Sequence, residues 1–155
     1  MVAMTSPKEI IRIGPIEVCF LLDGDTTAGA MSVFEFTVPP GSRVPAAHYH
    51  ERVEEIAYGL TGVLTFTVAG RPHYIGPGDS CFIPRGAVHH FVNEGIEPSR
   101  TLTVMTPATI GPAYFREMSA LLASGGAPDP TRVAEIMHRH GLIAVPLGAQ
   151  SATQA

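Results

Sequence analysis

The chain has 155 residues, of which 45% are hydrophobic, and this fits one globular domain with a sizeable core. A formal net charge of −4 without any run of lysine and arginine argues against binding to nucleic acid or to an anionic membrane surface. Because only 15% of the residues are charged and the mean hydropathy is +0.20, we expect a homodimer that covers part of the apolar surface. Because nucleic acid and membranes are disfavoured, we expect the protein to act on or bind a small molecule.

The cysteines and the N-terminal segment indicate the cellular setting. Cys19 and Cys81 lie far apart and form no CxxC pair, so a disulfide framework or a thiolate zinc site has no support. The first residues lack a basic stretch followed by a sustained apolar one, and no segment approaches the length of a membrane span. We therefore expect a cytoplasmic protein.

Residues 1–110 contain short runs rich in valine, isoleucine, phenylalanine and threonine, separated by glycine and proline turns. The runs are 16–22, 31–38, 63–68, 73–75, 80–83, 89–92 and 101–105. Such spacing predicts an all-β sandwich or barrel over residues 1–110. We expect residues 16–22 to add an edge strand close to the dimer interface.

Residues 111–155 have a different pattern, which predicts a helical extension of the same domain. Residues 112–123 place apolar side chains on one helical face, and a second helix begins after Asp129 as N-cap and ends at Gly141. Two placements remain open: packing on the outside of a sheet, which we favour, or folding across the barrel mouth as a lid hinged at residues 124–128. Residues 148–155 are predicted to be disordered.

Two histidines and a nearby glutamate suggest a metal site. His48 and His50 share one face of a strand, Glu55 opens the next apolar run, and His89 follows a Pro84–Gly86 turn. An HxH motif alone is found more often in a polar surface hairpin than in a metal site. The segment that contains His89 therefore decides the interpretation. Imidazole and carboxylate donors without a thiolate suit one divalent ion of iron, manganese, nickel, copper or zinc.

The two segments resemble the paired motifs of the cupin superfamily. The first reads Gly41, six residues, His48-Tyr49-His50, four residues, Glu55, six residues and Gly62, with one residue more after Gly41 than the family pattern. The second matches at every position, through Gly78, Pro84, Gly86, His89 and Asn93. The resemblance implies a single jelly-roll β-barrel (double-stranded β-helix), usually dimeric, in which His48, His50, Glu55 and His89 bind one metal ion.

The strand that follows Glu55 bears on the size of the substrate. Alternation places Ala57 and Gly59 on the face of Glu55, where the family often has bulkier residues, and Phe91 shares the face of His89. These three residues are candidates for a substrate pocket. The alternative is that Phe34, Phe36 and Phe91 fill the volume from other strands.

The resemblance to small quercetin-dioxygenase-like cupins implies a metal-dependent dioxygenase acting on a small enolic or phenolic compound. Glu55 is the candidate catalytic base. The alternatives are a redox-neutral isomerase, lyase or decarboxylase, and a small-molecule-binding module without catalysis.

Overall fold

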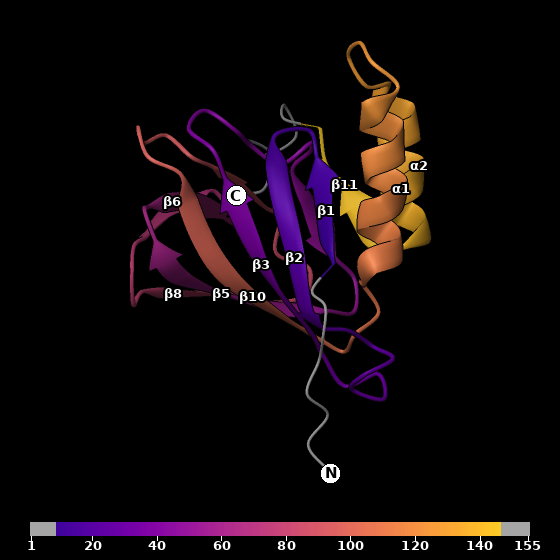
Figure 1. The fold of residues 1–155 in the computed structure, drawn as a ribbon. Helices are drawn as coiled ribbons and strands as arrows, with labels where there is room; N and C mark the ends of the chain where they lie inside the picture. The colour runs from indigo at the N-terminus through magenta and orange to yellow at the C-terminus, as the bar shows by residue number, and fades with distance from the viewer. Residues whose placement is uncertain (1–8, 147–155) are drawn as a thin grey trace, which may run out of the picture.

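The computed structural model describes residues 9–146 and folds them into two antiparallel β-sheets that face each other, with two helices along one side (Figure 1). This is a jelly-roll sandwich, so the predicted all-β fold with a C-terminal pair of short helices is confirmed. The stretch 148–155, predicted to be disordered, lies outside the described residues. No helix within residues 9–146 is long and apolar enough to cross a membrane.

The two sheets differ in their number of strands, and the motif residues are divided between them. The six-stranded sheet contains, in spatial order, β1 (Ile10–Ile13), β2 (Ile16–Leu22), β3 (Ser32–Val38), β10 (Ser99–Thr106), β5 (Glu54–Thr61) and β8 (Ser80–Ile83). The five-stranded sheet contains β11 (Leu142–Ala144), β4 (His48–His50), β9 (His89–Val92), β6 (Leu64–Val68) and β7 (Arg71–Ile75). The HxH pair and His89 therefore lie in one sheet, and Glu55 lies in the other.

Residues 16–22 do not form the edge of the sheet, contrary to our expectation. They form β2, which is paired on one side with β3 and on the other with β1. The hairpin between β1 and β2 turns at Gly14, whose φ of 56° favours glycine. The four-residue strand β1, which the sequence analysis missed because its run is so short, is the edge strand.

The core between the sheets is built from alternating strand residues and is strongly aromatic. Phe34 and Phe36 point inward from β3, and their ring centroids are 5.1 Å apart. Phe91 of β9 lies 5.2 Å from Phe36, so aromatic rings bridge the two sheets. The sequence analysis gave two possibilities for the interior. The second, in which these phenylalanines fill the volume, holds for much of the core.

Asn93, the last residue of the second motif, has a structural role. It is fully buried, and its Nδ2 donates to the carbonyl oxygens of Val38 and Glu97, each at 2.8 Å. Its Oδ1 accepts from the Gly95 amide at 2.9 Å. The side chain thus satisfies backbone groups at a sheet end where the strand ladders stop.

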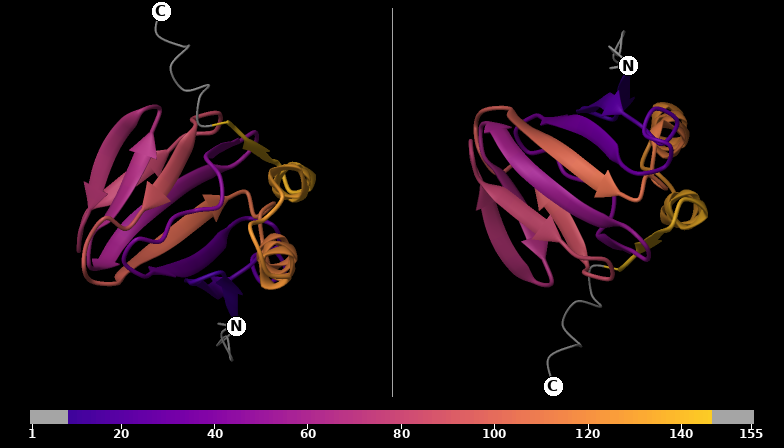
Figure 2. Two further views of the ribbon diagram at one scale, coloured as in Figure 1. Left: turned by 90° about the horizontal axis from the view of Figure 1, so that it is seen from above. Right: turned by 90° about the horizontal axis from the view of Figure 1, so that it is seen from below.

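The helices α1 (Pro112–Ala123) and α2 (Pro130–Arg139) close the open side of the sandwich between the edge strands β1 and β11 (Figure 2). Our favoured placement, on the outer face of a sheet, was wrong, because the apolar face of α1 enters the gap between the sheets. Phe115 of α1 packs its ring 5.3 Å from that of Phe34. The predicted N-cap of α2 is confirmed, since the Asp129 carboxylate accepts from the Thr131 amide at 2.9 Å.

Gly59 in β5 is required by a close backbone approach. A Cβ atom at this position would lie 1.9 Å from the carbonyl oxygen of Gly76. The Gly59 amide donates to the Asp79 carbonyl, and the Gly59 carbonyl accepts from the Gly78 amide, at 2.9 and 3.0 Å. The strand and the turn at residues 76–79 are therefore locked together backbone to backbone.

We expect Gly59→Ala to destabilise the fold by about 3 kcal/mol or more, because backbone atoms on both sides would have to move. Gly111→Ala is the matched control, since nothing lies within 4 Å of a Cβ added there and its φ of −136° suits any residue. That change at the N-cap of α1 should stay within about 1 kcal/mol. Urea denaturation of both variants tests this, and equal midpoints would contradict it.

Candidate metal centre

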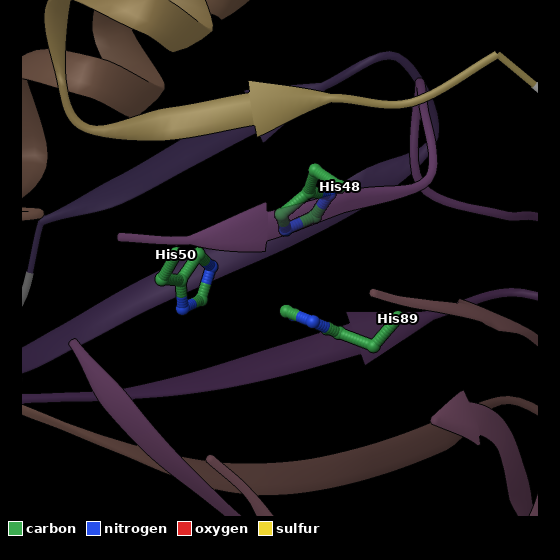
Figure 3. A group of neighbouring side chains, drawn as sticks. All are labelled: His48, His50 and His89. Carbon is green, nitrogen blue, oxygen red and sulfur yellow. The ribbon is translucent and has the colours of Figure 1, made fainter. Parts of the chain in front are cut away.

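Three histidine rings converge inside the sandwich. His48 and His50 extend from β4 toward His89 of the neighbouring strand β9 (Figure 3). One ring nitrogen from each histidine can be chosen so that all three lie within 4.8 Å of one another. Since metal-bound imidazole nitrogens from one coordination sphere lie about 3–4 Å apart at bond lengths near 2.1 Å, this spacing fits a single ion after small side-chain adjustments.

The strand β4 holds the HxH pair because backbone hydrogen bonds fix it on both sides. His48 pairs with His89 of β9, and the three residues of β4 pair with β11. The Gly86 amide, in the turn of the second motif, donates to the His50 carbonyl at 2.8 Å, and the φ of 81° at Gly86 favours glycine. The two sequence motifs are therefore joined directly beside the histidines.

Hydrogen bonds set the orientation of two of the rings. Nδ1 of His48 lies 2.8 Å from the carbonyl oxygen of Ala46, and Nδ1 of His89 lies 2.9 Å from that of Ala87. Because a carbonyl only accepts, each Nδ1 carries the proton and Nε2 is left to face the centre. Both ring nitrogens of His50 are buried without any hydrogen-bond partner among the described residues. An unpaired buried nitrogen among two oriented imidazoles is what a bound ion would satisfy.

Glu55 joins the site from the opposite sheet but stands to one side of the three nitrogens. Its side chain is 4% exposed, and Oε2 lies 3.3 Å from His89 Nε2 and 3.8 Å from His50 Nδ1. The structure thus brings all four predicted residues together, while the tight group consists of the three histidines alone. The carboxylate is close enough either to complete a coordination sphere or to exchange a proton there.

Burial keeps two of the imidazoles neutral. It lowers the pKa of His48 to about 3, with the charge of His89 as the next cause, and it lowers the pKa of His50 to about 2, reinforced by His48 and His89. Burial also lowers the pKa of His89, but the hydrogen bond and charge of Glu55 outweigh it, so the net shift is upward. Neutral imidazole is the form that ligates metal, and an ion would replace the proton that His89 shares with Glu55.

The histidines and Glu55 border a small apolar cavity of about 50 Å³, called here the inner cavity. Of the three predicted pocket residues, Phe91 lines it. Ala57 is fully buried in the core and Gly59 faces the turn at Gly76, so neither contributes to its wall.

The C-terminal segment supplies a wall of the inner cavity that the sequence analysis did not assign. The contributing side chains are Tyr114, Phe115 and Met118 of α1, Met137 of α2 and Leu142 of β11. The apolar face of residues 112–123 was the available signal, but helical periodicity indicates only that a face is buried and does not show against what.

Four other histidine, cysteine and glutamate side chains lie away from the centre. His73 is exposed on β7, and Cys81 is buried as a small apolar residue. His140 packs on the Tyr114 ring, and its Nε2 lies 2.8 Å from the Glu117 carboxylate. Glu54 pairs with Arg85 at 3.0 Å on the outer surface. None of these four side chains contributes to the centre.

Comparison with known proteins supports the resemblance seen in the two motifs. Residues 34–105, which hold both motifs, match the model of the cupin domain. The chain contains a cupin domain. A curated relative, the protein SchB of Streptomyces halstedii, is 34% identical over 84 residues, which are 53% of this chain. The match spans 60% of the length of that relative.

Solved structures extend the similarity over a larger share of the chain. The polyketide cyclase RemF from Streptomyces resistomycificus is 29% identical with a TM-score of 0.59, over 72% of this chain and 82% of that one. A predicted oxalate decarboxylase from Thermotoga maritima is 30% identical with a TM-score of 0.59, over 64% of this chain and 91% of that one. The solved structures that share this fold are therefore named for different chemistries.

The lowered pKa values predict how acid affects the metal-free protein. Since unfolded histidine titrates near 6.5, the unfolded chain binds more protons at His48 and His50 below that pH, and stability is lost as the pH falls from about 6.5. The raised pKa of His89 acts in the opposite sense, but two groups outweigh one. We expect chelator-treated protein to melt at a lower temperature at about pH 5 than at about pH 7.5.

Differential scanning fluorimetry in matched buffers measures this shift. The pH dependence should shrink in His50→Gln and persist in His73→Gln, because His73 is exposed on β7. A melting temperature that rises on acidification would show that the imidazoles are not held in the neutral form.

Proposed function

We propose that the protein is a metal-dependent enzyme acting on a small enolic, phenolic or related organic substrate. His48, His50 and His89 would hold one divalent transition-metal ion, and Glu55 would transfer a proton beside it. The observation that carries the proposal is the buried Glu55 carboxylate, 3.3 Å from His89 Nε2 but outside the group of three nitrogens. A carboxylate in that position is free to act on a substrate.

The residues around the site suit proton abstraction next to a carbonyl or phenol. When bound, the ion would supply Lewis acidity that polarises a substrate oxygen. Glu55 faces the inner cavity from β5 and can accept a proton from a substrate carbon or hydroxyl group. The apolar walls contributed by Phe91, Phe115 and Met118 exclude water, which strengthens the electrostatic interactions inside.

Redox-neutral chemistry is the reaction class that we favour. Among the relatives of at least 25% identity, one is named a polyketide cyclase and one a predicted oxalate decarboxylase. Ring closure and decarboxylation both pass through enolate-like charge that a metal ion and a nearby base can stabilise. The favoured reaction is therefore proton transfer that leads to carbon–carbon bond formation or cleavage.

Dioxygenation of the same kind of substrate is the second candidate, as in the quercetin-dioxygenase-like cupins that the motifs resemble. The donor set favours it in one respect. Three imidazoles and a carboxylate without a thiolate suit iron and manganese as well as zinc.

Turnover assays with Glu55→Gln test the proposed role of the carboxylate. Purified without an affinity tag and offered a panel of 1,3-diketones and phenols, the variant should lose about a hundredfold or more in kcat and keep its metal, because the histidines remain. Glu54→Gln is the matched control, since Glu54 is the adjacent residue but pairs with Arg85 outside. Full activity in Glu55→Gln would contradict the proposal.

Oxygen-uptake measurements on the same panel separate the two reaction classes. Turnover without oxygen consumption supports the redox-neutral reaction, and stoichiometric consumption supports dioxygenation. Tight ligand binding without turnover of any compound would favour the non-enzymatic binding module.

We also propose that the protein is a cytoplasmic homodimer, in line with its free cysteines, Cys19 and Cys81. The outer face of the six-stranded sheet exposes three large apolar side chains: Ile56 at 44%, Tyr58 at 42% and Phe82 at 59%. Ile56 and Phe82 are direct cross-strand partners in β5 and β8, so the three form one patch. Apolar patches of this kind commonly pack against a second copy.

Light scattering of Phe82→Lys tests this interface. The wild type should be a dimer at micromolar concentration and the variant a monomer, because a buried lysine would have no partner across the interface. Tyr74→Lys, at an exposed position on β7 of the other sheet, should remain dimeric. A monomeric wild type would overturn the proposal.

A further inference from the structure

A second and larger hollow, called here the outer groove, lies beside the inner cavity. Its volume is about 620 Å³, within the usual range for small-molecule sites, while the inner cavity has only about 50 Å³. It is bordered by residues 43–47, the end of β9, the first turns of α2 and the chain after β11.

The two hollows share one wall. Val44, Pro45, Ala46 and Phe91 line both of them. The Val44 amide donates to the Phe91 carbonyl at 3.3 Å, while Nδ1 of His48 donates to the Ala46 carbonyl at 2.8 Å. This wall belongs to the segment in which the first motif has its extra residue, so the departure from the family pattern lies between the metal centre and the outer groove.

The polar side chains of the outer groove are not paired with one another. Its lining is mostly apolar, with Arg43, His90 and Glu94 as the exceptions. Glu94 already accepts a hydrogen bond from the Thr65 hydroxyl at 3.0 Å. Among residues 9–146, Arg43 has no side-chain hydrogen bond or ion pair, and the buried Nδ1 of His90 has no partner. An unpaired guanidinium beside an unpaired imidazole is suited to an anionic oxygen.

Arg43 and His90 lie in the same part of the groove. Arg43 pairs with Val92 of β9, and His90 lies two residues away on the same face of that strand. The His90 imidazole can donate a hydrogen bond while Arg43 supplies the positive charge. This end of the groove therefore presents a donor and a cation, next to an apolar surface made by Val92, Val133 and Ala134.

We propose that the outer groove is a binding site of its own, separated from the metal centre by the shared wall, for an elongated, largely apolar molecule ending in a carboxylate or an ionised phenol. The anionic oxygen pairs with Arg43 and accepts from His90, and the apolar body lies along α2. The binding requires neither the metal nor the proposed reaction.

Fluorescence titration with two related probes tests the groove in the full chain after metal removal. The probes are 8-anilinonaphthalene-1-sulfonate, which is anionic, and N-phenyl-1-naphthylamine, which is its uncharged counterpart. We expect saturable binding of both, with Arg43→Ala weakening the anionic probe about tenfold, or about 1.4 kcal/mol, and leaving the neutral probe unchanged. Ala134→Trp should block both probes, because the added ring occupies the groove beside α2.

Controls distinguish this result from a general change of fold or charge. Arg43→Lys should retain most of the affinity, and Arg71→Ala, on the exposed strand β7, should bind like the wild type. Circular dichroism melts confirm that each variant is folded. Equal affinity of Arg43→Ala and wild type for the anionic probe, or the absence of saturable binding to the wild type, would overturn the proposal.

The same titration separates this proposal from the proposed function. If Arg43 governs binding of the anionic probe while no metal-dependent turnover exists, the groove is retained and the enzymatic role fails. If metal-dependent turnover exists and Arg43→Ala does not change probe binding, the enzymatic role is retained and the groove assignment fails.

Discussion

The pairing of the short strand β4 between β9 and β11 is the constraint on which the site depends. It places His48 opposite His89 and aligns His50 with the turn at Gly86. Three imidazoles are then packed with ring centroids 4.6 to 5.2 Å apart. Without an ion, that arrangement leaves both nitrogens of His50 unsatisfied, which is unfavourable in a buried position. The scaffold therefore maintains a local arrangement that only a ligand for those nitrogens would fully stabilise.

The C-terminal segment converts this site from an open sandwich edge into an enclosed one. Phe115 and Met118 enter from α1, and β11 completes the sheet next to β4. The helices are thus both structural support and part of the cavity wall. The sequence analysis had treated structural support and a lid over the site as separate alternatives. Enclosure lowers the local dielectric and lowers the pKa of His48 and His50 through burial, so the tail contributes to the chemistry without supplying a polar group.

Much of the site could be predicted because its signals are local. The period of two in a strand places His48 and His50 together, and the fixed spacing of the second motif adds His89 and Asn93. The position of Gly59 could not be predicted, because its role depends on the approach of the Gly76 carbonyl from a turn distant in sequence. The pairing of β11 with β4 is likewise non-local, and three residues carry too weak a pattern to identify a strand. The outer groove depends on how residues 43–47 bend around the extra residue, and turn chemistry alone does not determine such a bend.

The central claim, that His48, His50 and His89 together hold one metal ion beside Glu55, is tested most directly by the metal content of tag-free protein. Elemental analysis by plasma mass spectrometry should find about one divalent transition-metal ion per wild-type chain, as expected for a single three-histidine centre. The double variant His48→Ala/His89→Ala should contain none, while His73→Ala should retain the full amount. Unchanged metal content in the folded double variant would contradict the account.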